Sequence, residues 1–201
     1  VKTSDSGVRA EDVTLGGKVQ LITSNSGIRV ERGVFDALQC KTSNSGIALS
    51  DTNARDCEAA TSNSGITVER CAFEDCLCKT SNSRITLEDV TGGRCEAVTD
   101  NARVTAERCS FSRQLWLTTI NGAIQVDAAA APDISLQTSN GAIKGTLLGE
   151  EADYAVISRT SNAKNNLQEA GSQNASNRLR AVTSNGRIRL EFVPAPPESE
   201  A

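Results

Sequence analysis

Cysteine is the residue type in this 201-residue chain whose clustering most strongly suggests chemistry. All seven cysteines lie between residues 40 and 109, where disulfides or a zinc site could form. However, their number is odd, no Cys-x-x-Cys pair occurs, and the chain has no histidine to complete a zinc site. Cys57, Cys76 and Cys95 recur every 19 residues at a position that Leu or Ile fills elsewhere. We therefore expect reduced core thiols, with a disulfide among these three as the alternative.

Acidic residues also recur, at intervals of 19 or 20 residues with one gap at Ser50, and stacked like charges repel unless they are neutralised. We expect neutralisation by the neighbouring column, in which aspartate alternates with Arg32, Arg70 and Arg108. Calcium is the alternative, because hard cations prefer clustered carboxylates. The acidic positions are Glu11, Glu31, Glu69, Glu88, Glu107 and Asp127. The calcium candidates are Glu69, Glu88 and Glu107, but we assign no metal and no cofactor.

Hydroxyl groups are concentrated in a hexapeptide, Thr-Ser-Asn-Ser-Gly-Ile, which begins at Thr23 and returns at Thr42 and Thr61. A nucleophilic serine needs a neighbouring base, and the absence of histidine removes the commonest one. A motif that returns so regularly is typical of a structural corner. We therefore predict no catalytic residue.

Looser copies of the hexapeptide extend the repeat along nearly the whole chain, with steps of 19 to 23 residues. They begin at Thr3, Thr80, Thr99, Thr119, Thr138, Thr160 and Thr183. Such a period indicates a solenoid. Apolar residues alternate with polar ones after each threonine and before it, which predicts short strands with one buried face. A weaker apolar pair lies ten and twelve residues after each threonine.

Each repeat is therefore predicted to form three strands and three turns. The predicted fold is all-β, a single-stranded parallel β-helix of about ten rungs, right-handed, spanning residues 1–192. An all-β sandwich is the alternative, but a sandwich gives no reason for the same residue type to recur at the same position of every repeat.

Asparagine follows the repeat threonine by two residues in nine of the ten copies. Stacked amides can bond to the rungs above and below, and Asn tolerates the left-handed conformation of a tight corner. We predict a structural ladder formed by Asn25, Asn44, Asn63, Asn82, Asn101, Asn121, Asn140, Asn162 and Asn185.

A second period, of 38 residues, places phenylalanine at the same position of alternate repeats, at Phe35, Phe73 and Phe111. In the repeats between them this position is occupied by Ala54 and Gly92. Large and small residues that alternate along a stack let wide rings extend into the space of the neighbouring rung. This pattern predicts alternate packing inside the core.

The repeat becomes irregular after Gly145, where Asn165 and Asn166 replace apolar residues. We expect surface loops near residues 148–154 and 169–177. Residues 193–201 are rich in proline and predict a disordered tail or linker.

The copies Thr138-Ser139-Asn140-Gly141-Ala142-Ile143 and Thr183-Ser184-Asn185-Gly186-Arg187-Ile188 resemble those of a bacterial adhesin-like family of β-solenoid domains of unknown function. The resemblance covers about residues 3–192. It implies a parallel β-solenoid and carries over no catalytic residues. It also implies a location at the cell surface or outside the cytoplasm, although reduced cysteines leave the cytoplasm open.

Three functions follow from these observations. The first is a non-enzymatic binding or adhesion scaffold for a protein or glycan, and the second is a structural solenoid that associates end to end or through sheet edges, or supports a neighbouring domain. A polysaccharide lyase or hydrolase is the third, which the missing histidine disfavours. The net charge of −4 argues against nucleic acid. No apolar run is long enough to insert into a membrane. Any binding site is expected on the irregular C-terminal rungs or an exposed sheet face.

Overall fold

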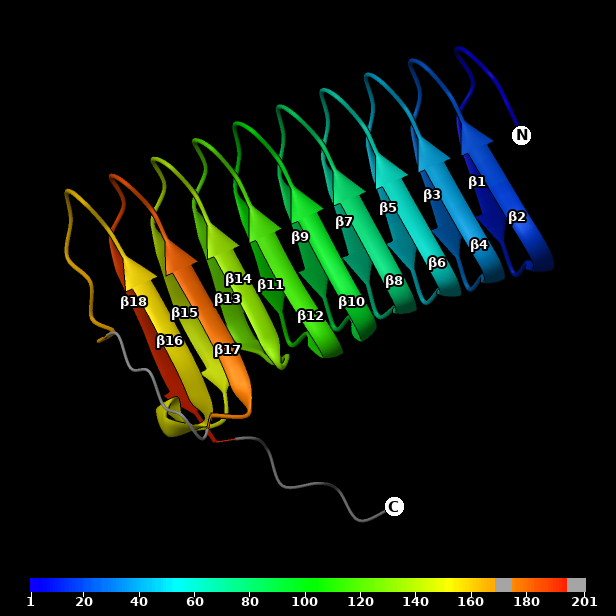
Figure 1. Cartoon of the computed structure of the whole chain (residues 1–201). Helices are drawn as coiled ribbons and strands as arrows, with labels where there is room; N and C mark the ends of the chain where they lie inside the picture. The colour runs from blue at the N-terminus through cyan, green and yellow to red at the C-terminus, as the bar shows by residue number, and fades with distance from the viewer. Residues whose placement is uncertain (169–174, 195–201) are drawn as a thin grey trace.

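Two parallel β-sheets form the body of the protein, and the computed structural model describes residues 1–168 and 175–194. As far as β16 the chain passes from one sheet to the other and back, so each turn adds a strand to both; β16 and β17 then follow each other in sheet 2 (Figure 1). Sheet 1 consists, in spatial order, of β1 (Val8–Glu11), β3 (Ile28–Glu31), β5 (Ile47–Ser50), β7 (Ile66–Glu69), β9 (Ile85–Glu88), β11 (Val104–Glu107), β13 (Ile124–Ala129), β15 (Ile143–Leu148) and β18 (Ile188–Val193). Sheet 2 consists of β2 (Thr14–Ile22), β4 (Val34–Lys41), β6 (Asn53–Ala60), β8 (Ala72–Lys79), β10 (Thr91–Val98), β12 (Ser110–Thr118), β14 (Asp133–Gln137), β17 (Asn177–Val182) and β16 (Tyr154–Arg159).

The parallel solenoid confirms the predicted fold class, but each turn contains two strands where three were predicted. In β4 the inward-facing Phe35 and the inward-facing Leu38 belong to one continuous strand. The two residues between them shift the inward phase, as a β-bulge does. In the sequence, this interruption of the alternation between inward and outward residues looks the same as a turn between two strands, which is why three strands were predicted. Each sheet has nine strands in the described residues, which gives about nine turns where about ten rungs were predicted.

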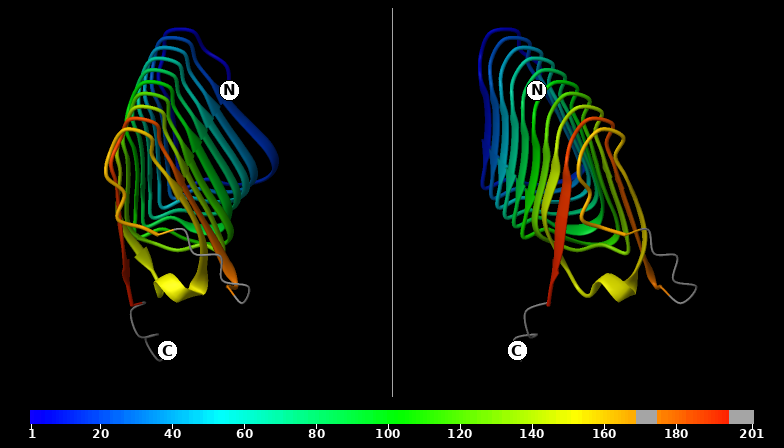
Figure 2. Two further views of the ribbon diagram at one scale, coloured as in Figure 1. Left: turned by 60° about the vertical axis from the view of Figure 1, so that its left-hand side comes forward. Right: turned by 90° about the vertical axis from the view of Figure 1, so that its left-hand side faces the viewer.

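The cross-section is a wedge, narrow at the Thr-Ser-Asn corner and wide at the opposite end (Figure 2). Side chains of both sheets fill it, and the residue five positions after the repeat threonine is buried from Val8 to Ile143 and again at Ile188. The predicted alternation along the axis is confirmed, because Phe73 lies between Ala54 and Gly92 in the register. A Cβ atom at Gly92 would lie 1.6 Å from the carbonyl oxygen of Phe73, so only glycine fits there.

The predicted asparagine ladder is present along the narrow edge of the wedge. Each side-chain amide donates to the neighbouring Asn or Asp at 2.6–2.9 Å, for example Asn63 Nδ2 to Asn44 Oδ1 at 2.8 Å. The repeat threonines lie behind it and are largely buried. The hydroxyl of Thr61 donates to the carbonyl oxygen of Ser45, at 2.9 Å, and other repeat threonines do likewise. The hydroxyl and amide groups of the motif thus tie the corners together.

The last two turns are stacked in the reverse of their order along the chain. β17 pairs with β14 on one side and with β16 on the other (Figure 1). The asparagine ladder follows the same order, because Asn185 donates to Asn140 and Asn162 donates to Asn185. The rungs therefore do not all stack in chain order, because the Thr183 rung lies between the Thr138 and Thr160 rungs.

Glycine explains why the later repeat takes the inner place. A Cβ atom at Gly186 would lie 1.7 Å from the carbonyl oxygen of Gly141, so the corner next to Gly141 must be glycine. The Thr160 copy has Ala163 at that position. It also offers Asn165 where the Thr183 copy places Ile188 against Ile143. Asn165 instead makes an isolated bridge to Ile188 at the end of the stack.

The predicted irregular segments fall where the turn order changes. A short 3₁₀ helix, η1 (Glu151–Asp153), connects β15 to β16 and confirms the loop expected near 148–154. Most of the loop expected at 169–177 lies outside the described residues, although β17 already begins at Asn177. Residues 195–201 of the predicted tail also lie outside them, and β18 continues to Val193.

Candidate functional site

The cysteine cluster is part of the hydrophobic core. All seven cysteines are buried free thiols. Cys57, Cys76 and Cys95 lie side by side on β6, β8 and β10, and the Cys76 and Cys78 Sγ atoms are 3.8 Å apart. Burial raises the pKa of Cys40 to about 12. These thiols are therefore weak nucleophiles in the folded protein.

The recurring acids lie at the ends of the sheet 1 strands, beside the predicted arginine column. Glu69, Glu88 and Glu107 are register neighbours on β7, β9 and β11. Arg108 contacts Glu88 and also forms a bidentate ion pair with Asp89, in which the distance from Nε to Oδ1 is 2.7 Å. In residues 1–168 and 175–194 no group of three or more His, Cys, Asp or Glu side chains is placed to hold a metal ion.

The arginine pairs repeat every second turn and lie in a tight bend. Arg70 pairs with Asp51 at 2.8 Å, as Arg108 does with Asp89. The hydrogen bond from Arg70 lowers the pKa of Asp51, and the bond from Arg108 lowers the pKa of Asp89. These two arginines and two aspartates all have positive backbone φ angles near 50°. These charges are therefore matched within the protein, which supports the expected neutralisation.

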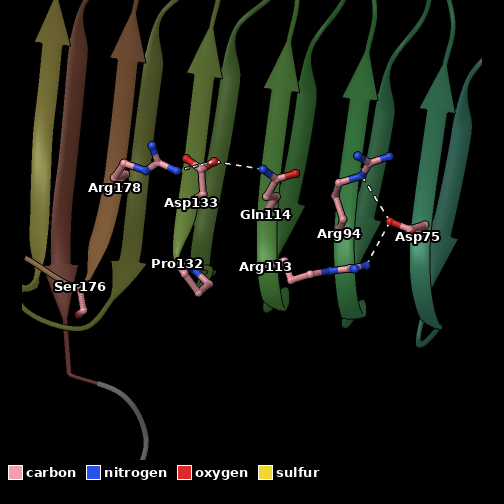
Figure 3. A pocket seen from close by; sticks show the side chains of 8 residues that line it. All are labelled: Asp75, Arg94, Arg113, Gln114, Pro132, Asp133, Ser176 and Arg178. Carbon is pink, nitrogen blue, oxygen red and sulfur yellow. Dashed lines mark hydrogen bonds and ion pairs between the residues drawn. The ribbon is translucent and has the colours of Figure 1, made fainter.

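A groove on the outer face of sheet 2 is the feature that the sequence analysis missed. Its central hollow has a volume of about 400 Å³ and opens between β8 and β17 (Figure 3). Two clusters line it. In one, Arg94 and Arg113 contact Asp75 at 3.3 and 3.2 Å, and in the other Gln114 and Arg178 contact Asp133 at 3.2 and 3.8 Å.

Two further hollows extend this groove in both directions along the solenoid axis. Toward the C-terminal turns, a hollow of about 350 Å³ shares Asp133 and Arg178 with the central one and adds Ile157 and Arg180. Toward the N-terminal turns, a hollow of about 400 Å³ shares Asp75 and Arg94. The three hollows form the sheet 2 groove, which crosses the strands instead of following them.

Trp116, the single tryptophan of the chain, lies on the same outer face. It is 36% exposed, and its register neighbours are Glu96 on β10 and Ser135 on β14. Because Ser135 is small, the next large side chain in this column is Arg180 on β17. An exposed aromatic ring therefore lies on the face that carries these arginines, two strands from Arg180, and lines none of the three hollows.

The sequence contains only part of the signal for this groove. Outward positions five and three residues before each repeat threonine are irregular in type, which distinguishes them from the regular acidic column on sheet 1. Chain order, however, would have placed Ala155 and Ile157 beside Asp133 and Ser135. The reversed turns put Arg178 and Arg180 there instead.

Comparison with known proteins agrees with the solenoid and adds a family. Searches of curated proteins and of solved structures gave no match to this chain. In the described residues no helix is long and apolar enough to span a membrane. The Toastrack DUF4097 family model matches residues 18–191, which includes all but the first turn of the solenoid. The chain therefore belongs to the Toastrack DUF4097 family, a family of β-solenoid domains of unknown function.

Proposed function

We propose that this protein is a non-enzymatic binding scaffold whose ligand-binding surface is the sheet 2 groove. The observation that carries this proposal is the continuity of the three hollows on one face. Ligand sites are typically concave, with a few polar groups that orient the ligand. In the regular columns near the sheet 1 bend, by contrast, Arg70 and Arg108 each hold an aspartate through two hydrogen bonds, whereas Arg178 in the groove is 3.8 Å from Asp133.

The chemistry of the groove favours binding over catalysis. A glycosidase needs two carboxyl groups, one of which has a raised pKa and acts as the acid. Asp56 and Asp75 are the neighbouring carboxyl groups here, but arginines contact them at 3.2 and 3.3 Å. Both carboxylates are thus paired with guanidinium groups of the same protein. Glu58, in the same hollow, has a lowered pKa: hydrogen bonds from Lys41 and Gln39 outweigh the opposing effect of burial.

A structural solenoid that stacks end to end is the second candidate. The open edges of β2 and β16 favour it, since both strands pair on one side only over most of their length in the described residues. The β2 edge, however, has a shift in its register with β4 between Leu15 and Lys18. The backbone N–H of Gly17 donates to the side-chain carboxylate of Asp36 in the same protein. Bulges and charged residues at an edge hinder pairing with another chain.

A panel of defined polysaccharides and peptides tests the binding proposal. Ligand binding is measured by calorimetry for the wild type, for Arg178→Glu in the groove, and for Arg189→Glu on the opposite sheet as the charge-matched control. We expect at least one ligand that Arg178→Glu weakens and the control does not, and no cleavage products. Cleavage that Asp75→Asn abolishes would overturn the proposal.

The place of action is also part of the proposal. We infer a location at the cell surface or outside the cytoplasm from the adhesin-like resemblance alone. Seven free thiols are equally compatible with a reducing compartment. Fractionation of the native host with an antibody against this domain separates the two locations.

A further inference from the structure

We propose that the C-terminal half of the sheet 2 groove binds an acidic polysaccharide, with Arg94, Arg178 and Arg180 holding its carboxylates and Trp116 contacting a sugar ring. This inference rests on the proposed function and names the ligand class.

The groove carries arginine donors that are not used up within the described residues. Arg113 adds no unpaired positive charge to the groove, because it contacts both Glu74 and Asp75. Arg94 contacts Asp75 through Nε, and neither of its Nη atoms pairs with another described residue. Arg178 is 3.8 Å from Asp133 and its side chain is 76% exposed.

Arg180 is exposed and lies in the hollow next to Arg178. The two guanidinium groups leave the same face of β17, two residues apart, and Asp133 is the carboxylate that shares this part of the groove. Guanidinium groups bind carboxylates through two parallel N–H bonds, which favours an acidic ligand. This local excess of positive charge contrasts with the chain's net charge of −4.

The aromatic ring and the small residue beside it provide the apolar part of the site. Trp116 and Arg180 are two strands apart in the register, about 10 Å at the usual strand spacing, with Ser135 between them. Trp and Arg are the side chains that most often dominate binding energy. Glu96, on the other side of Trp116, repels an anion and so directs the ligand toward Arg178 and Arg180 on β17.

The surface favours a glycan over an acidic peptide. An extended peptide gains affinity by pairing its backbone with an open strand edge. At Trp116, Arg178 and Arg180 the backbone groups of β12, β14 and β17 are already paired within sheet 2, so at these strands side chains alone are available; the open edge of β16 lies one strand beyond them. A polysaccharide has no amide backbone to satisfy, and it can lie across the strands along the groove.

Fluorescence of the single tryptophan, combined with calorimetry, tests this inference directly. The probes are an oligogalacturonate, its methyl ester, a neutral malto-oligosaccharide and polyglutamate. We expect the oligogalacturonate to change Trp116 fluorescence and to bind at least about tenfold more tightly than the other three. Arg178→Glu and Arg180→Glu should each weaken it about tenfold or more, Arg189→Glu by less than twofold, and Glu96→Gln should strengthen it.

Other outcomes contradict the inference in distinct ways. Equal binding of the methyl ester would show that the carboxylates are not recognised. Equal binding of polyglutamate would make the site a general anion or peptide site. Calorimetric binding that leaves Trp116 fluorescence and the Arg178→Glu affinity unchanged would place the ligand elsewhere. If a neutral ligand binds instead and Arg178→Glu weakens it, the ligand class is wrong while the proposed binding function stands.

Discussion

The threonine that begins most of the repeats is a buried polar residue whose hydroxyl group donates to a carbonyl oxygen of the neighbouring corner. Thr61 donates to the carbonyl oxygen of Ser45, so the hydroxyl satisfies a main-chain acceptor at the corner. The sequence predicted a structural corner but did not show that threonine faces inward and serine outward. That assignment depends on the direction of the chain at the corner, which the residue types leave open.

Replacing Thr61 by valine should therefore lower stability although the two side chains have the same shape. The carbonyl oxygen of Ser45 would lose its hydroxyl donor inside the protein, at a cost of about 1–3 kcal/mol. Ser62→Ala, at the exposed neighbour, should change stability by less than about 0.5 kcal/mol. Urea unfolding of both variants measures the difference. Equal midpoints would show that the hydroxyl contributes nothing.

The buried thiols give a second prediction at the residue scale. Burial raises the pKa of Cys71 and of Cys109 to about 11, from an ordinary value of 9.0. Because the folded state favours the neutral thiols, their contribution to stability is complete below pH 9 and is lost as the pH rises toward 11. Native protein at pH 8 should react slowly with a thiol reagent, whereas unfolding without reductant should expose close to seven groups. Five or fewer would reveal a disulfide.

At the scale of single elements, glycine decides which corner can stack on which. Glycine stands four residues after the repeat threonine in one class of corner, as at Gly46, and three residues after it in another, as at Gly141. In the structure Gly122, Gly141 and Gly186 follow one another in space, and each lies against a carbonyl oxygen of its neighbour. Gly46 belongs to the other class, in which the nearest carbonyl oxygen is 3.4 Å from a Cβ atom.

The two classes predict opposite responses to the same substitution. Gly186→Ala should lower stability by about 3 kcal/mol or more, since its Cβ would overlap with the Gly141 carbonyl group. Gly46→Ala should cost less than about 1 kcal/mol and can even stabilise the protein, because alanine restricts the unfolded chain. Thermal unfolding of the two variants compares them. A similar loss in both would mean that the corners are not distinct.

At the scale of the whole molecule, the period of the repeat was sufficient to predict the parallel solenoid, its inward columns and the asparagine ladder. It was not sufficient to predict the groove. Arg178 lies beside Asp133 only because the last two turns exchange places, and a repeat pattern carries no information about such an exchange. The predicted number of strands per turn was wrong for a related reason. A bulge and a turn both interrupt the alternation of inward and outward residues, so the sequence does not distinguish them.

The exchange of turns can be tested with a pair of introduced cysteines. Ser135 is the register neighbour of Arg180, whereas Ile157 lies one strand further away. Neighbouring strands are about 4.8 Å apart and alternate strands about 10 Å, and cysteines whose Cα atoms are more than about 7 Å apart cannot form a disulfide without backbone movement. Mild oxidation should therefore link Ser135→Cys to Arg180→Cys but not to Ile157→Cys. The seven native thiols are buried and should stay reduced in both proteins. A disulfide between positions 135 and 157, detected by mass spectrometry of the digested protein, would instead mean that β16 follows β14 in chain order, and the proposed arginine site would lose Arg178 and Arg180.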